Sequence, residues 1–219
     1  MNFGFIDAIR KQKKNSIIGE VKVFSPVLGD LIRGRNAVEI AKTYEAAGCS
    51  AISYITAREF GGNLKTLEEI CKATRLPVLR KDFIKTSKEV EITSSTGASA
   101  LLLIARNLRE KTTELVDYCF EHGIEPVVEV FSEEDLNYTE NARVVLINNR
   151  NIFQPSDVDL KRTFQLAPKI KKLKISGSGI KSPKDLVVLK SVDAALVGTA
   201  FMLAENTFNF VKSFVEAKI

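Results

Sequence analysis

The chain has little histidine and little cysteine: one histidine, His122, and three cysteines in 219 residues. Cys49, Cys71 and Cys119 are widely spaced and form no C-x-x-C pair, which argues against a disulfide framework or a zinc site. They suit a reducing compartment, so we expect a cytoplasmic protein. His122 precedes Gly123 at the end of a helical pattern, so we expect it to lie at a helix C-terminus rather than to act in catalysis.

Long apolar runs are also missing. The run Ala98–Ala105, which contains Ser99, falls far short of the ~20 residues that a membrane helix requires. No charged and then apolar leader opens the chain, so we expect neither a secretory signal nor membrane binding. The net charge is +5, but lysines and arginines are spread along the whole chain. This distribution favours attraction of an anionic substrate over binding of nucleic acid.

What the chain does contain is a repeating unit of apolar strand, turn and amphipathic helix. We expect strands at Ile17–Val23, Ser50–Ile55, Pro77–Lys81, Ala98–Ile104, Glu125–Val130, Arg143–Asn148, Leu173–Ser176 and Ala194–Val197. We expect helices at Asn36–Ala47, Lys65–Thr74, Ser87–Thr96, Arg109–Glu121, Glu133–Thr139, Asp157–Leu166, Pro183–Leu189 and Asn206–Ala217. Strands alternating with helices predict a parallel sheet with right-handed crossovers.

The turn after the first strand decides between an open and a closed sheet. An open doubly wound sheet usually carries a G-x-G-x-x-G motif there, whereas this chain reads Phe-Ser-Pro-Val-Leu-Gly over residues 24–29. A domain of ~200–250 residues with this alternation is typical of an α/β barrel. We therefore predict a single (β/α)8 TIM barrel over residues 1–219.

Charged residues interrupt strands that should be apolar. Glu20 and Lys22 are two apart, so both side chains lie on one face of the first strand, and Val21 and Val23 take the face toward the helices. Glu20 and Lys22 should therefore point into the barrel. A buried ion pair that only supports the structure stabilises weakly, so we favour a role in a site.

Further polar residues end other strands, where the active site of a barrel lies. Lys81 ends the third strand and Glu129 the fifth, and Asn148 and Arg150 follow the sixth. A lysine near other charges can act as a general acid. Arg80 is the outward neighbour of Lys81, and we expect it to be solvated or to form a salt bridge. Together these side chains predict a single reactive site around one rim.

The last two strands end in small residues. They run into Ser176–Ile180, with the sequence Ser-Gly-Ser-Gly-Ile, and Leu196–Ala200, with the sequence Leu-Val-Gly-Thr-Ala. Backbone N–H groups of such turns can approach an oxyanion closely. Barrels often bind phosphate with the loops after strands seven and eight. The pattern therefore predicts a phosphorylated substrate, and the Ser25 hydroxyl after the first strand could add a hydrogen bond.

These motifs occur together in one known family. The chain resembles indole-3-glycerol-phosphate synthase in Glu-Val-Lys-Val-Phe-Ser-Pro (20–26), Phe-Gly-Gly (60–62) and Leu-Arg-Lys-Asp-Phe (79–83). The resemblance continues, in order, through Glu-Pro-Val-Val-Glu-Val (125–130), Ile-Asn-Asn-Arg-Asn (147–151), Ser-Gly-Ile (178–180) and Val-Gly-Thr-Ala (197–200). It covers nearly the whole chain from about Ile17 onward. The family converts 1-(o-carboxyphenylamino)-1-deoxyribulose 5-phosphate to indole-3-glycerol phosphate, with loss of carbon dioxide and water and without a metal or organic cofactor.

The resemblance implies a role for each matching residue. Lys81 would be the general acid for ring closure, and Lys22 would bind the substrate carboxylate and assist as a second acid. Glu20 and Glu129 would orient groups and abstract a proton during dehydration. Asn148, as a further catalytic residue, and Arg150 would orient the substrate hydroxyls and the catalytic groups. The remaining residues would bind substrate: Phe83, Leu102 and Ile104 its aromatic ring, Ser178 the substrate, and Ser25, Gly179, Gly198 and Thr199 its phosphate.

The chain departs from the family pattern in four respects. Gly177 stands where the family usually has a glutamate, Phe24 where it has a lysine, and Val27 where it has a small polar residue. The segment before the first strand is also short, and Phe3, Phe5 and Ile9 can form only a short helix. We expect reduced or altered activity relative to the family norm.

Three alternatives remain open at this point. The loss of the glutamate at position 177 suggests a diverged phosphate-binding barrel with weak or no synthase activity. A related phosphoribosyl isomerase would need a cysteine and an aspartate at opposite strand ends, but Cys49 starts a strand and Cys119 lies within a helix. A nucleic-acid-binding protein would need a basic stripe, which is missing. We expect a monomer or a weak homo-oligomer.

Overall fold

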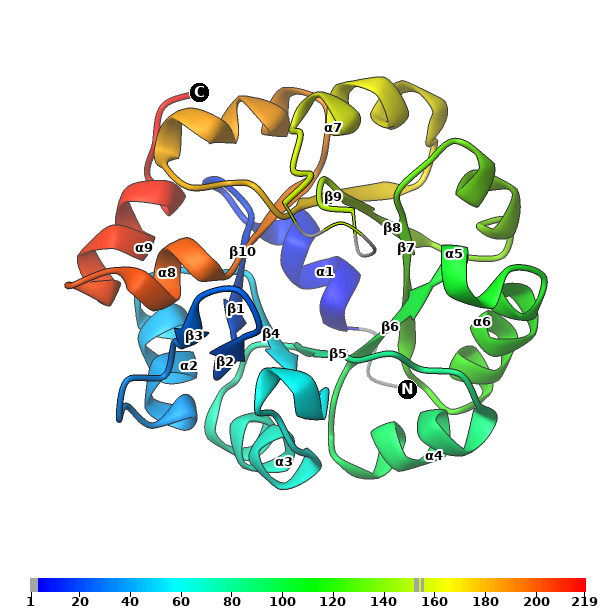
Figure 1. Cartoon of the computed structure of the whole chain (residues 1–219), viewed down its shortest axis with the longest axis horizontal. Helices are drawn as coiled ribbons and strands as arrows, with labels where there is room; N and C mark the ends of the chain where they lie inside the picture. The colour runs from blue at the N-terminus through cyan, green and yellow to red at the C-terminus, as the bar shows by residue number, and fades with distance from the viewer. Residues whose placement is uncertain (1–3, 152–153, 155) are drawn as a thin grey trace.

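Eight parallel strands form a closed barrel in the computed structural model, which describes residues 4–151, 154 and 156–219. The strands are β1 (Ile17–Val21), β4 (Ala51–Ile55), β5 (Val78–Lys81), β6 (Ala100–Ile104), β7 (Glu125–Val130), β8 (Val144–Asn148), β9 (Leu173–Gly177) and β10 (Ala194–Val197). Each pairs in parallel with its neighbour along the chain, and β1 closes the ring against β10 (Figure 1). The predicted TIM barrel is confirmed.

The strand positions are those expected, with small differences at the ends. The bounds of β7 and β10 are as predicted, whereas β1 ends at Val21 rather than Val23. There the chain turns away from the barrel, and the carbonyl of Val23 accepts hydrogen bonds from the N–H groups of Leu31 and Ile32 at 2.9 Å each. Lys22 therefore lies just beyond the strand, at the rim.

Alternation along each strand separates an inner from an outer core. Inward-facing side chains such as Ile18, Leu79, Leu102, Leu146 and Ile175 form one buried cluster inside the barrel. Their neighbours pack outward, against the helices, in two further clusters. The strands are apolar on both faces because helices cover one face and the barrel interior buries the other.

Helices surround the barrel, and one further helix at the start of the chain lies across its end (Figure 1). They are α1 (Gly4–Lys11), α2 (Ala37–Ala46), α3 (Leu64–Ala73), α4 (Ser87–Ser95), α5 (Ala105–Leu108), α6 (Lys111–Glu121), α7 (Lys161–Leu166), α8 (Thr199–Leu203) and α9 (Thr207–Val215), with 3₁₀ helices at Arg58–Phe60, Glu134–Tyr138, Ala167–Lys169 and Pro183–Lys190. The expected cap of α2 is confirmed, since Asn36 accepts hydrogen bonds from the N–H groups of Val38 and Glu39.

Three predicted helices differ from the structure. The segments predicted at Glu133–Thr139 and Pro183–Leu189 are short 3₁₀ helices, which are common as connectors. The helix predicted from Asp157 begins only at Lys161, because Val158 forms a β-bridge with Arg150 instead. The sequence pattern also missed α5, α8 and a hairpin of β2 (Phe24–Ser25) and β3 (Gly29–Asp30) after the first strand.

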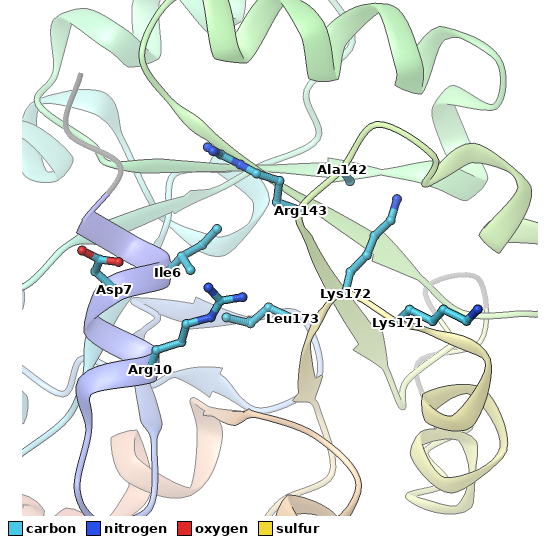
Figure 2. A pocket seen from close by; sticks show the side chains of 8 residues that line it. All are labelled: Ile6, Asp7, Arg10, Ala142, Arg143, Lys171, Lys172 and Leu173. Carbon is cyan, nitrogen blue, oxygen red and sulfur yellow. The ribbon is translucent and has the colours of Figure 1, made fainter.

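The short N-terminal helix closes one end of the barrel. Phe5 and Ile9 of α1 are buried among the side chains of the barrel interior. The predicted helix is confirmed for these two residues, and Phe3 lies outside the described residues. A cavity of about 470 Å³ between α1 and the segments before β8 and β9 lies at this end (Figure 2). The helix therefore covers the N-terminal ends of the strands, opposite the end where the site was predicted.

The basic side chains around this cavity do not converge. Arg10 points toward Leu173, whereas Lys171 and Lys172 point away from it (Figure 2). Lys172 donates hydrogen bonds to the carbonyls of Thr139 and Glu140. The basic side chains are therefore not arranged to bind one anion together. In the part of the chain that the structure describes, no helix is both long and apolar enough to span a membrane.

Candidate active site

The C-terminal mouth of the barrel holds two lysine–glutamate pairs. Glu20 lies on β1 and Lys22 just after it, and Nζ of Lys22 is 3.8 Å from Oε1 of Glu20. Lys81, at the end of β5, places its Nζ 3.9 Å from Oε2 of Glu129, near the end of β7. The predicted inward orientation of Glu20 and Lys22 is confirmed, because both side chains are largely buried and face the lysine of β5.

The two pairs act on each other electrostatically. Burial lowers the pKa of Lys22 and outweighs the opposing effect of Glu20, and the positive charges of Lys81 and Arg150 lower it further. Burial alone would also lower the pKa of Lys81, but the carboxylates of Glu129 and Glu20 raise it above its ordinary value. The pKa values of the two lysines are thus shifted in opposite directions, so Lys22 gives up its proton more easily than Lys81.

One carboxylate oxygen in this mouth has no hydrogen-bond donor among the described residues. Oε2 of Glu129 is buried and, among the described residues, makes no hydrogen bond. The nearest cation, Lys81, lies beyond hydrogen-bond distance at 3.9 Å. A buried acceptor without a partner is costly, so an incoming donor or proton at this oxygen would be stabilised.

Glu20 packs tightly against the last strand. A Cβ atom added at Gly198 would lie 2.4 Å from Oε1 of Glu20, so the carboxylate of Glu20 keeps this position only with glycine at 198. Lys22 in turn donates a hydrogen bond from Nζ to Oγ1 of Thr199, at 3.0 Å. The predicted acid–base residues of β1 and the predicted phosphate turn after β10 are therefore in direct contact.

The exit of β8 adds an amide and a guanidinium. Asn148 is buried at the end of β8, and its Oδ1 accepts a hydrogen bond from the backbone N–H of Arg150 at 3.0 Å. The charge of Arg150 acts on both Lys22 and Lys81. The structure thus places Arg150 at the same mouth as the lysines, as the sequence predicted.

An apolar wall lies beside the charged groups. Leu102 and Ile104 of β6 face the barrel interior, and the partly buried Phe83, which follows β5, packs against the same cluster. The three residues predicted to surround an aromatic ring are therefore brought together. Ile104 pairs in register with Glu129 on the neighbouring strand, so the apolar wall borders its carboxylate.

The turn after β9 has an unusual backbone. Ser178 has a φ of 66° and Gly179 a φ of 82°, both in the left-handed region that glycine favours. A Cβ atom at Gly179 would also lie 2.8 Å from Cγ1 of Val158. The glycine of the predicted phosphate turn is therefore required both by its backbone conformation and by close packing.

Ser25 has a local role in the structure. It lies in β2, and its Oγ accepts hydrogen bonds from the N–H groups of Val27 and Leu28 at 3.3 Å each. The hairpin leaves Val27 and Leu28 largely exposed. The hydroxyl of Ser25 thus supports its own turn, and its suggested contact with phosphate stays a prediction.

Arg80 differs from the expectation of a solvated side chain. It is 5% exposed and forms the predicted salt bridge, to Asp82 at 2.9 Å. It also donates hydrogen bonds to Oγ1 of Thr56 and of Thr93, at 3.0 and 2.7 Å. The guanidinium is therefore buried between β5 and the helices, and this network holds the backbone on either side of Lys81.

The cysteines and the histidine take no part in the described site. Burial raises the pKa of the Cys49 thiol far above its usual range and that of Cys119 to about 12. Both lie in the outer core, so the cysteine acid–base pair of an isomerase is not formed. His122 ends α6, and its Nδ1 lies 2.9 Å from the carbonyl oxygen of Tyr118, which confirms the predicted position at a helix C-terminus.

Comparison with known proteins gives one consistent result. The family model for indole-3-glycerol phosphate synthase matches residues 1–214. A tryptophan biosynthesis protein TrpCD from Archaeoglobus fulgidus is 57% identical over 97% of the chain, which spans 40% of that protein's length. The indole-3-glycerol phosphate synthase of Pyrococcus furiosus is 50% identical over 99% of both proteins.

Solved structures support the same fold. The tryptophan synthase α subunit from Legionella pneumophila superposes with a TM-score of 0.67 at 13% identity, over 98% of the chain and 96% of that subunit. At this sequence identity, the structural similarity shows only that the two proteins share the barrel fold. The family match, the full-length relatives and the arrangement of the rim residues agree: the chain belongs to the indole-3-glycerol phosphate synthase family, the carboxy-lyases that serve tryptophan biosynthesis.

Proposed function

We propose that this mouth closes the indole ring of 1-(o-carboxyphenylamino)-1-deoxyribulose 5-phosphate and releases indole-3-glycerol phosphate, carbon dioxide and water. The observation that carries the assignment of roles is that two lysine–glutamate contacts, at 3.8 and 3.9 Å, lie at one mouth of the barrel. The reaction needs both acids and bases, and this arrangement supplies both at one place.

Lys81 acts first. The aromatic carbon that bears the carboxylate attacks the ketone carbon, the new carbon–carbon bond forms, and the ketone oxygen takes up a proton. Lys81 donates that proton, because its raised pKa keeps it an ammonium at neutral pH. The partly buried position beside Glu129 holds Nζ in place for this step.

Loss of carbon dioxide and water follows. The carboxylate leaves as carbon dioxide and its electron pair restores the aromatic ring. The hydroxyl formed in the first step then leaves as water, with Lys22 as the second acid, since its lowered pKa favours release of a proton. In the same step, the carbon between the nitrogen and the hydroxyl-bearing carbon loses a proton. Glu129, whose Oε2 makes no hydrogen bond among the described residues, or Glu20 takes up that proton.

The remaining residues hold the substrate. Phe83, Leu102 and Ile104 pack on the aromatic ring, and Lys22 pairs with its carboxylate before decarboxylation. Asn148 and Arg150 orient the hydroxyl groups of the sugar chain. The phosphate is bound by backbone N–H groups of the turns after β9 and β10, at Ser178, Gly179, Gly198 and Thr199, with Ser25 as a further donor.

The proposed reaction can be tested directly. The purified chain is mixed with the carboxyphenylamino-deoxyribulose phosphate, and formation of the indole ring is followed by its fluorescence. We expect turnover with release of one carbon dioxide per indole. Saturable binding of the substrate without ring closure would instead support a diverged phosphate-binding barrel.

All residues that are assigned a role belong to a single copy of the chain. This agrees with a monomer or a weak homo-oligomer, acting on a phosphorylated small molecule in the cytoplasm. Sedimentation of the purified chain, with and without substrate, measures the oligomeric state.

Replacement of Gly177 by glutamate is expected to raise turnover. Position 177 ends β9 beside Asn148, and an added Cβ would contact only the Leu146 side chain, at 3.4 Å, with no positive φ to oppose it. Restoring a carboxylate should increase kcat by about 2- to 10-fold, up to about 1.4 kcal/mol of barrier. Gly177→Gln, which has the size but not the charge, is the control. Equal kcat values for the wild type and Gly177→Glu would show that the missing carboxylate does not limit this enzyme.

A further inference from the structure

Asn149 lies between the acid–base site and the phosphate turn but has no role in the mechanism above. It follows Asn148 directly, is fully buried, and faces away from the barrel interior toward β9 and α7. Its Nδ2 lies 3.0 Å from both Oγ of Ser176 and the carbonyl oxygen of Gly177. A third acceptor, the carbonyl oxygen of Ser178, lies at 3.2 Å.

The other end of the same amide faces the start of α7. Oδ1 of Asn149 accepts hydrogen bonds from the backbone N–H of Thr163 at 3.2 Å and from its Oγ1 at 2.9 Å. The carbonyls of Gly177 and Ser178 can only accept, and the N–H of Thr163 can only donate. An amide side chain of this length is therefore the group that satisfies both sides.

The turn that Asn149 holds is strained. Ser178 adopts a φ of 66° although it is not glycine, and Gly179 follows at 82°. Such conformations persist only where surrounding contacts enforce them. Asn149 supplies three of those contacts, to the residue before the turn and to its first two residues.

We propose that Asn149 is a positioning residue that holds the turn of Gly177, Ser178 and Gly179 in the conformation that binds the substrate phosphate. The proposal rests on the proposed function, since it takes this turn as part of the phosphate site. Asn149 touches neither the substrate nor the reacting atoms, and it acts through the direction of the backbone N–H groups in the turn. Its contribution is therefore to affinity for the phosphate group and not to ring closure.

Asn149→Asp is the sharpest test, because the two side chains have the same shape. The variant keeps the acceptor that faces Thr163 and replaces the donor that faces Gly177 and Ser178 with an oxygen that repels their carbonyls. KM for the substrate and the inhibition constant of inorganic phosphate should both rise about 10- to 100-fold. The value of kcat should stay within about threefold of the wild type.

Two further variants separate positioning from a loss of folding. Asn15 also donates from its side-chain amide to two carbonyls, those of Phe214 and Ala217, but lies before β1 at the opposite end of the barrel. Asn15→Asp is thus the matched control and should lower thermal stability without changing KM. Thr163→Val removes one partner of Asn149 and should raise KM in the same direction, whereas Thr163→Ser should not.

A phosphate-free substrate analogue decides between the possible outcomes. The proposal is supported if Asn149→Asp weakens the phosphorylated substrate but leaves inhibition by the analogue unchanged. If the wild type binds the phosphorylated substrate and the phosphate-free analogue equally well, the turn does not bind phosphate. In that case the proposed function of the turn and the role of Asn149 are both wrong. If the wild type prefers the phosphorylated ligand and a folded Asn149→Asp or Thr163→Val variant keeps that preference, the phosphate turn stands and the role of Asn149 is overturned.

Discussion

Replacement of Lys81 by methionine is expected to abolish formation of indole-3-glycerol phosphate while leaving the fold and substrate binding largely intact. The variant keeps the length of the side chain in a partly buried position but cannot donate a proton to the ketone oxygen. Loss of a general acid lowers rates by about 10²- to 10⁴-fold. Indole fluorescence measures kcat, and equilibrium binding of the substrate to the inactive variant measures affinity.

The control for Lys81 is a lysine that also pairs with a glutamate but lies on the surface. Lys88 is such a residue, with Nζ 3.3 Å from Oε2 of Glu91 and a largely exposed side chain. Exposed ion pairs contribute little to the free energy of unfolding, so Lys88→Met should fold normally. Its kcat should therefore be unchanged. A Lys81→Met protein with full activity would show that another group protonates the ketone.

Replacement of Glu129 by glutamine should reduce turnover and alter the titration of Lys81. The loss of a proton acceptor predicts a fall in kcat of about 10²-fold or more. Burial lowers the pKa of Lys81, and the charges of Glu129 and Glu20 raise it. Removing the larger of the two raising charges must therefore lower this pKa, so Lys81 loses its proton at a lower pH than in the wild type. NMR of the lysine side chain follows the titration.

Glu125 provides a matched control on the same strand. It is fully buried at the opposite end of β7 and pairs with Arg143 at 2.5 Å. Glu125→Gln should lower stability, because it removes the buried negative charge that pairs with Arg143, but should change neither kcat nor the titration of Lys81. An unchanged Lys81 titration in Glu129→Gln would mean that Glu129 does not hold the acid in its protonated form.

The positions of the charged rim residues could be predicted because a strand has a strict period. Glu20 and Lys22 are charged residues at alternate positions of an apolar strand, so they had to share the inner face. Lys81 and Glu129 end their strands, and the ends of parallel strands meet at one mouth. The structure confirms that these side chains come together, because the closure of the barrel follows from the repeated unit.

Arg80 and Asn149 could not be predicted in the same way. Their partners come from other segments of the chain: Thr56 and Thr93 for Arg80, and Ser176 and Thr163 for Asn149. A buried polar side chain looks like a solvated one in the sequence unless its partners are known. The two asparagines at the end of β8 are visible in the sequence, but the sequence pattern predicts a role only for the first, Asn148.

The amino-acid sequence by itself determined the barrel, the order of its strands and the rim residues, because these follow from the local periodicity of apolar and charged side chains. Tertiary structure alone decided which buried polar groups satisfy one another and that α1 closes the end of the barrel away from the site. Those features depend on contacts between segments far apart in the chain, and no local pattern specifies such contacts.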